Sequence, residues 1–143
     1  MLIPIKVAMA HVYADDADQE QVEWKLASAI ESAEQYMGRR IYANADELAK
    51  AQASATASLG NLKPLDDTLP VLALQTLADA RRSEQYALVM QMRGVVMNSS
   101  IEIGILLILG DLYMNRENTT DKPANELPMG ALHHLQPFRY MGV

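Results

Sequence analysis

The chain has 143 residues and a formal charge of −6, from 18 acidic and 12 basic side chains, and its residues are 50% hydrophobic but only 6% aromatic. This length suits a single domain that buries its own core, and the acidic balance argues against a generic DNA- or RNA-binding protein. The absence of cysteine excludes disulfides, thiolate zinc sites and a cysteine nucleophile. Because alanine, leucine and methionine supply most of the apolar residues, the composition favours helices over strands.

The N-terminal part of the chain predicts a short leading segment and then an amphipathic helix. Residues 1–12 form an extended arm or a short helix, because Pro4 disfavours a long helix there. From Asp16 to Met37, apolar side chains recur at three- and four-residue steps, which is typical of a helix with one buried face. Acidic residues at its start complement the helix dipole, and Gly38 is a suitable C-terminal stop.

The middle of the chain predicts a helical insertion over 43–98. Its first helix, over 44–58, is alanine-rich and has Asn44 as its N-cap. The following helix is capped by Asp67 or Thr68 and continues to about Met92. The stretch from Tyr86 to Met97 contains valines that also suit a strand, but we interpret it as helix.

The C-terminal part predicts the most hydrophobic helix of the chain. This helix begins after a cap at Ser99 or Ser100, and it is apolar on nearly all sides, so we expect it to be buried as the central core element. A short helix over 128–135 follows, and residues 137–140 form an extended tail.

These elements together predict an all-α fold in a single domain over residues 1–143. We expect a small bundle of about four to five helices around one central buried helix, with extended N- and C-terminal arms. No signal peptide is visible, and the longest apolar stretch is far shorter than the ~18 residues of a membrane span, so we expect a soluble, intracellular protein.

The sequence predicts no metal, no cofactor and no enzymatic activity. Asp16, Asp18 and Glu20 alternate as in a calcium-binding EF-hand loop, but the required glycine and final glutamate positions hold other residues. His133 and His134 are adjacent, so on a helix they point about 100° apart and suit a surface better than a shared metal. The chain has no G-x-S-x-G, G-x-G-x-x-G or phosphate-binding P-loop motif.

Two features are candidate interface residues. Arg39 and Arg40 follow Gly38 directly, where their charges either complement the helix dipole or contact an acidic partner or DNA phosphate. Trp24 lies off the apolar stripe of its helix, so it either widens the core face or anchors another chain. The residues leave both pairs of alternatives open.

Three segments carry a resemblance to a known family. They run, with interruptions, from Asp15 to Arg40, from Ile105 to Glu117, and from Glu126 to Arg139, and together they cover about half of the chain. The most specific elements are Tyr-x-Asn-Arg-Glu and Leu-Pro … Pro-aromatic-Arg. In these segments the sequence resembles the head–tail connector (adaptor) proteins of tailed bacteriophages and prophages, although its helical middle is longer.

The resemblance implies a non-enzymatic virion protein at the head–tail junction, assembled in the bacterial cytoplasm. Such proteins form a homo-oligomeric ring under the portal protein, extend the channel through which DNA passes without sequence-specific binding, and dock head-closure or tail-completion proteins. By the same resemblance, Arg116 and Glu117 form ion pairs within or between subunits. The tail residues are candidates for a docking arm that becomes ordered on assembly: Pro137, Phe138, Arg139 and Tyr140.

An alternative function belongs to a different class. The chain could be a small helical regulatory or protein-binding module that forms a low-order oligomer and uses its alanine-rich helix to bind a partner. Size separates the two hypotheses, because a connector forms a large cyclic oligomer.

Overall fold

The computed structural model describes residues 2–115 and 126–141. Within them it is mostly helical, which confirms the predicted class, and it adds a two-stranded parallel sheet. The elements are α1 (Ile5–Val12), η1 (Asp16–Asp18), α2 (Gln19–Met37), β1 (Ile41–Tyr42), α3 (Ala45–Gly60), α4 (Val71–Met92), β2 (Val95–Val96), α5 (Ser99–Met114), α6 (Met129–Leu135) and η2 (Gln136–Phe138), where η marks a 3₁₀ helix.

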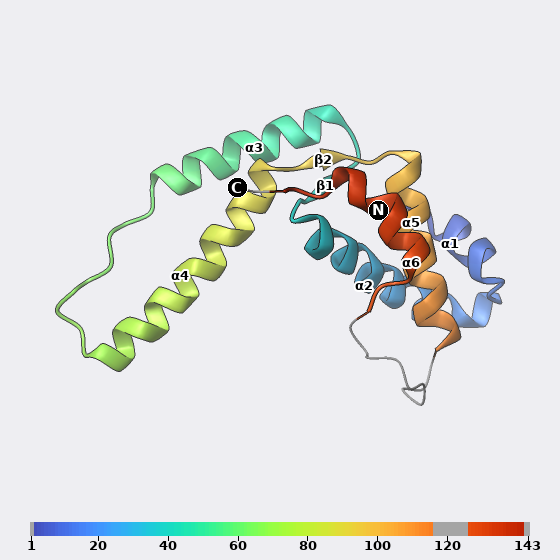
Figure 1. Cartoon of the computed structure of the whole chain (residues 1–143), viewed down its shortest axis with the longest axis horizontal. Coiled ribbons are helices and arrows are strands. Elements are labelled where there is room, and N and C mark those ends of the chain that lie inside the picture. Colours follow the sequence, from blue (N-terminus) through green and yellow to red (C-terminus); the bar gives the residue numbers. More distant parts are fainter. Residues whose placement is uncertain (1, 116–125, 142–143) are drawn as a thin grey trace.

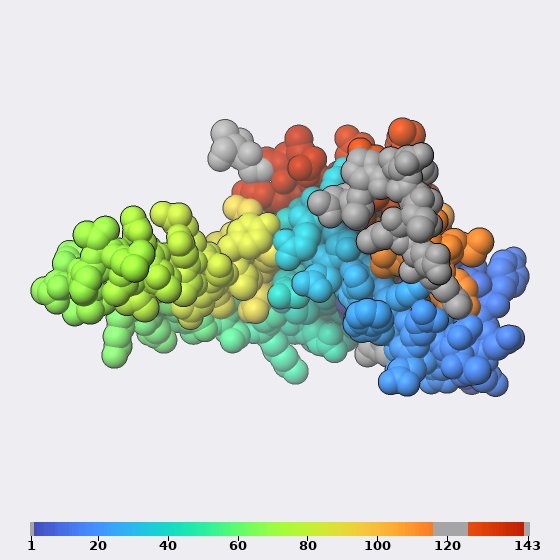
Figure 2. Space-filling view, turned by 90° about the horizontal axis from the view of Figure 1, so that it is seen from below, coloured from blue at the N-terminus to red at the C-terminus, as the bar shows by residue number. Residues whose placement is uncertain are grey.

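The molecule consists of a helical body and a projecting hairpin (Figure 1). In the body, α5 packs against α1, α2 and α6, while in the hairpin α3 packs against α4. Figure 2 shows the hairpin extending from the body along the long axis of the molecule. The hairpin occupies the segment that the sequence predicts as a helical insertion.

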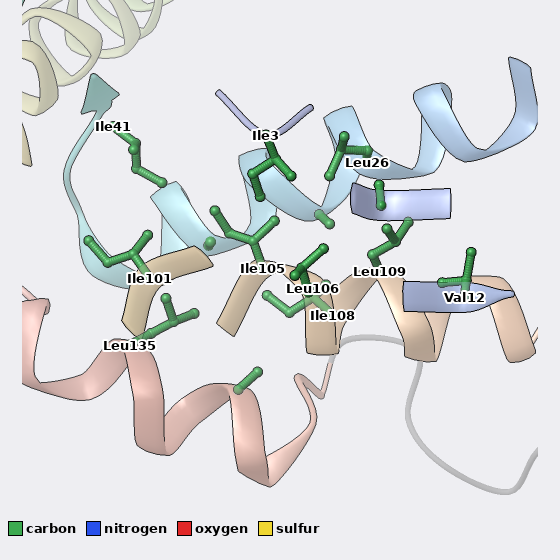
Figure 3. Close-up of a cluster of buried hydrophobic side chains, with 14 of the residues drawn as sticks. Ile3, Val12, Leu26, Ile41, Ile101, Ile105, Leu106, Ile108, Leu109 and Leu135 are labelled. Atoms are coloured by element: carbon green, nitrogen blue, oxygen red, sulfur yellow. The ribbon is translucent and has the colours of Figure 1, made fainter. Parts of the chain in front are cut away.

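The core of the body lies around α5, as the sequence predicts (Figure 3). The side chains of Ile101, Ile105 and Leu109 are fully buried there, opposite Leu26 of α2 and Leu135 of α6. The burial of α5 is not complete on all sides, however, because Ile103 is 44% exposed. This large apolar side chain is therefore open to solvent in the single chain.

Most helix boundaries fall where the sequence places them. Asn44 caps α3 by accepting a hydrogen bond from the Glu47 backbone N–H at 2.9 Å, and Gly38 ends α2 with a φ of 65°, in the left-handed region that glycine tolerates. The predicted cap of α5 is wrong. Asn98, rather than Ser99 or Ser100, accepts the hydrogen bond from the Ile101 backbone N–H, at 2.9 Å.

The predicted continuation of α4 to residue 97 is wrong. The helix ends at Met92, and Val95 and Val96 pair in parallel with Ile41 and Tyr42 of β1. Gly94 permits this turn because a Cβ there would lie 2.6 Å from Cε2 of Tyr42 and 3.0 Å from the carbonyl oxygen of Gln91. Such distances are too short for any other residue without displacement of its neighbours.

The two terminal arms are also not extended. Residues 5–12 form α1, which confirms the short helix of the two alternatives for this segment, and Ile3 before it is fully buried in the core. At the other end, α6 continues into η2, and the backbone N–H of Tyr140 donates to the Met37 carbonyl at 2.8 Å. Both ends of the described chain therefore fold back onto the body, because each carries apolar side chains that the core can bury.

Candidate assembly interface

The turn after α2 is built around a buried carboxylate. Glu34 is 6% exposed, and its Oε1 accepts a hydrogen bond from the Ile41 backbone N–H at 3.0 Å. Its Oε2 pairs with Nη1 of Arg40, also at 3.0 Å. The chain that leaves α2 through Gly38 is thereby held against the helix and directed into β1. Arg40 thus has a partner within the chain itself.

Arginines and tyrosines from three distant segments gather beside this turn. We call this group the arginine–tyrosine cluster; its members are Tyr36, Arg39, Arg93, Arg139 and Tyr140. The guanidinium of Arg93 lies 3.6 Å from the centroid of the Tyr140 ring, and that of Arg39 lies 6.0 Å from it. The guanidinium of Arg139 lies 5.0 Å from the centroid of the Tyr36 ring. These are cation–π distances.

The backbone explains why these residues meet. The parallel pairing of β2 with β1 brings the end of α4, and Arg93 with it, next to the exit of α2. The hydrogen bond from Tyr140 to Met37 places the C-terminal segment on the same exit. Three segments therefore converge where the hairpin joins the body (Figure 1).

The positive charge of this cluster is not neutralised locally. The ion pairs among residues 2–115 and 126–141 are Arg40 with Glu34 and Arg82 with Asp79, so Arg39, Arg93 and Arg139 form none there. The buried Nε of Arg39 also has no hydrogen-bond partner among the described residues. The cluster thus presents positive charges held by aromatic rings instead of carboxylates.

The phenol of Tyr42, on β1 beside the buried carboxylate, has a pKa shifted by its burial. Desolvation raises the pKa of the Tyr42 phenol above its usual 10.0, and the nearby positive charge of Arg40 opposes that rise. The phenol therefore remains neutral at physiological pH.

A second surface surrounds the start of α2. Trp24 is 75% exposed, so the interpretation that it widens the core face is wrong. Together with Ala17, Glu20 and Gln21 it lines an open hollow of about 370 Å³, which we call the tryptophan hollow. The exposed carboxylates of Asp15 and Asp16 precede the hollow in the chain. An exposed indole beside several carboxylates suits a cationic or aromatic side chain of another molecule.

The remaining candidates have different surroundings. Phe138 is partly buried against the core, whereas Pro137 is exposed. Arg116 and Glu117 lie outside the described residues, so their predicted ion pairs stay a prediction. His133 is exposed, and the carbonyl of His134 accepts a hydrogen bond from the Ser100 hydroxyl at 3.0 Å. Within residues 2–115 and 126–141 no three side chains are grouped as metal ligands, and no helix could span a membrane.

The structure thus joins some predicted residues and separates others. Arg39, Arg40, Arg139 and Tyr140 come together, while Trp24 lies near the opposite end of α2. Sequence reasoning missed Arg93, because only the pairing of two very short strands brings it to the cluster. It also missed Glu34, because the sequence of α2 does not show that the chain after Gly38 folds back over this side chain.

The chain was compared with protein-family models, with curated proteins and with solved structures, and no match was found in any of the three.

Proposed function

We propose that this chain is a subunit of a bacteriophage head–tail connector. In this role, copies of the chain assemble into a ring under the portal protein, extend the DNA channel and dock a head-closure or tail-completion protein. The ring works by fitting between its neighbours, and no bond-making step is assigned to it.

One observation carries the proposal. The segments that resemble the connector family correspond to η1 and α2, to α5, and to α6 with η2. In the structure α5 packs against both α2 and α6, and η2 packs against α6. The segment that departs from the family is the projecting hairpin (Figure 1). The resemblance therefore follows the packed body, as expected if the body is inherited and the hairpin is an addition to it.

The charge of the chain is consistent with a channel through which DNA moves. A net charge of −6 repels phosphate over distances up to the Debye length, about 8 Å at physiological ionic strength. Acidic side chains that face the lumen would let the genome slide without sticking. The cationic side chains of the arginine–tyrosine cluster would then lie away from the lumen, within contacts between proteins.

Imaging tests the proposal. The purified chain is examined by negative-stain electron microscopy, alone and after mixing with the portal protein of the same genome. We expect rings of one diameter, and rings seated coaxially on the portal in the mixture. A chain that forms no ring and does not bind the portal would contradict the proposal.

A specific observation favours the alternative of a small binding module. Helix α4 exposes Val71, Leu72 and Leu77, and Met90 is its one buried residue. An apolar helix surface of this kind can bind a partner helix. A low-order oligomer that binds a cellular protein through α4 and does not bind the portal protein would support this second function.

A further inference from the structure

We propose that copies of this chain join head to tail, with the arginine–tyrosine cluster of one copy docked on the tryptophan hollow of the next. The inference deepens the proposed function, on which it rests for the closure of the ring. It names the two surfaces that meet and the side chains that hold them together.

The two surfaces lie at opposite ends of one rigid element. The tryptophan hollow includes residues of η1 and of the first turns of α2, and the arginine–tyrosine cluster surrounds the last turn and exit of α2. This helix has 19 residues, so about 28 Å separates its ends. In Figure 1 the start of α2 lies at the end of the body that is far from the hairpin, and its exit lies where the hairpin begins.

The charges of the two surfaces are opposite. Asp15, Asp16 and Glu20 are exposed, and no basic residue occurs between residues 13 and 24. Asp18 does not belong to these exposed carboxylates, because it is partly buried and accepts a hydrogen bond from the Tyr113 hydroxyl at 3.0 Å. At the other end, Arg39, Arg93 and Arg139 form no ion pair among residues 2–115 and 126–141. A surface with excess negative charge and one with excess positive charge attract one another when they belong to two copies.

The chemistry of the hollow suits a guanidinium. Arg139 is the exposed arginine of the cluster, so it can reach a neighbouring molecule. In the hollow, a guanidinium can stack on the Trp24 indole and pair with the Glu20 carboxylate at the same time. Arginine and tryptophan are also the residues most enriched among those that dominate binding at protein interfaces.

The pairing of unlike surfaces determines the kind of assembly. Since the surface on one copy differs from the surface it meets, the contact is heterologous. After one contact, one copy still has an unused tryptophan hollow and the other an unused arginine–tyrosine cluster. Repetition of such a contact gives a ring when the rotation between copies closes. A dimer made by one surface pairing with itself would instead leave no surface for further growth.

Charge reversal tests the contact. Arg139→Glu places a carboxylate in the cluster, and Glu20→Arg places a cation in the hollow. We expect each variant alone to associate at least about tenfold more weakly than the unaltered chain. Arg82→Glu is the matched control, because Arg82 is 79% exposed on α4, far from both surfaces, and we expect it to assemble normally.

Mixing the two variants gives the decisive result. In a mixture, Arg139 of the Glu20→Arg chain meets Glu20 of the Arg139→Glu chain, and the reversed residues meet one another. We therefore expect the mixture to assemble with alternating subunits at concentrations where each variant alone assembles poorly. Misfolding of either variant cannot produce this recovery.

Trp24 provides an independent signal, because it is the only tryptophan of the chain. We expect its fluorescence emission to shift to shorter wavelength on assembly, and the shift to be lost in each single variant and regained in the mixture. High salt should weaken the assembly, because it screens the charges that attract the two surfaces.

Several outcomes would overturn the inference. These are single variants that assemble like the unaltered chain, a mixture of variants that does not regain assembly, a Trp24 emission wavelength that does not change on assembly, or a chain that remains monomeric at all concentrations. An Arg139→Glu chain that assembles normally but binds duplex DNA more weakly would also overturn the inference, and it would assign the cluster to phosphate binding. Rings that tolerate charge reversal would refute this contact but keep the connector function. Recovery on mixing by a chain that does not bind the portal would support the contact but contradict the connector function.

Discussion

Glu34 lies beneath the turn that follows α2, where it accepts hydrogen bonds from a backbone N–H and from a guanidinium. A buried carboxylate stabilises a fold only while its partners remain, because burial removes its hydration. Here the partners come from Arg40 and Ile41, a few residues further along the chain. The carboxylate therefore fixes the direction in which the chain enters β1, and with it the position of the arginine–tyrosine cluster.

We expect Glu34→Ala to lower the free energy of unfolding by about 2–4 kcal/mol, because it leaves the Ile41 N–H without its acceptor. Glu34→Gln keeps an acceptor oxygen and should cost less. Urea denaturation followed by circular dichroism measures both. Arg82→Ala, which removes an exposed pair with Asp79, should change stability by less than about 0.5 kcal/mol. An equal effect of the buried and the exposed substitution would contradict this role of Glu34.

The side chains were predicted least well where their surroundings come from distant segments. The exposed position of Trp24 was one of two alternatives that helix periodicity left open. The stacking of Arg93 on Tyr140 could not be predicted, because no local pattern joins the end of α4 to the end of the chain. Asn44 and Gly38 were correctly predicted, since a cap depends only on neighbouring backbone groups.

At the scale of elements, α5 and α6 approach closely at one glycine. A Cβ at Gly104 would lie 2.8 Å from Cγ of Leu135, which is itself fully buried. A Cβ at Gly110, on the same helix, would lie 3.5 Å from Nε2 of His11, an ordinary contact distance. The close packing of α6 on α5 therefore requires a glycine at position 104, whereas position 110 has room for a Cβ.

We expect Gly104→Ala to destabilise the protein by about 1–3 kcal/mol, because overpacking forces Leu135 or the α6 backbone to move. Gly110→Ala should be neutral or stabilising by up to about 1 kcal/mol, because alanine favours helix. Thermal unfolding of the two variants checks the difference. Equal melting temperatures for the two variants would show that α6 does not pack tightly on α5.

The C-terminal segment behaves as part of the body in the single chain. The expectation of an arm that becomes ordered only on assembly is therefore corrected, because Tyr140 already stacks under Arg93 and Phe138 contacts the core. We expect deletion of the residues after Gln136 to lower the melting temperature as well as to weaken assembly. Tyr140→Ala should share part of both effects, and Tyr140→Phe, which keeps the ring, should share neither. A truncated chain with unchanged stability would count against the packing of this segment.

The helices could be predicted because their apolar periodicity and caps are local signals. The pairing of β1 with β2 could not, since strands of two residues are too short for any alternating pattern. The projection of the hairpin also follows from long-range contacts. Ala55 is the one buried residue of α3, as Met90 is of α4, so these helices contribute little to the core.

Local stability should follow this division. Amide hydrogens of α5, with six buried residues, should exchange with solvent much more slowly than those in the first half of α4. Hydrogen exchange followed by mass spectrometry of the full chain resolves the two regions. Equal protection of the hairpin and the body would mean that contacts between copies hold the hairpin. In that case, dilution below the assembly concentration would remove the protection of the hairpin and leave that of the body.

At the scale of the whole molecule, the described part of the chain is elongated, with the hairpin at one end and the body at the other (Figure 2). Exposed large apolar side chains occur on both parts, including Trp24 on the body and Leu72 on the hairpin. A monomer gains nothing by exposing them, whereas a subunit buries them against its neighbours. The shape and the opposite charges at the two ends of α2 together favour repeated association of identical copies.

The mass of the assembled particle tests this account most directly. Light scattering coupled to size-exclusion chromatography, over a wide range of protein concentration, measures that mass without assuming a shape. A closed ring predicts one discrete species of fixed subunit number that does not grow further as concentration rises. A particle that remains a monomer or dimer throughout, or that lengthens without limit, would contradict it.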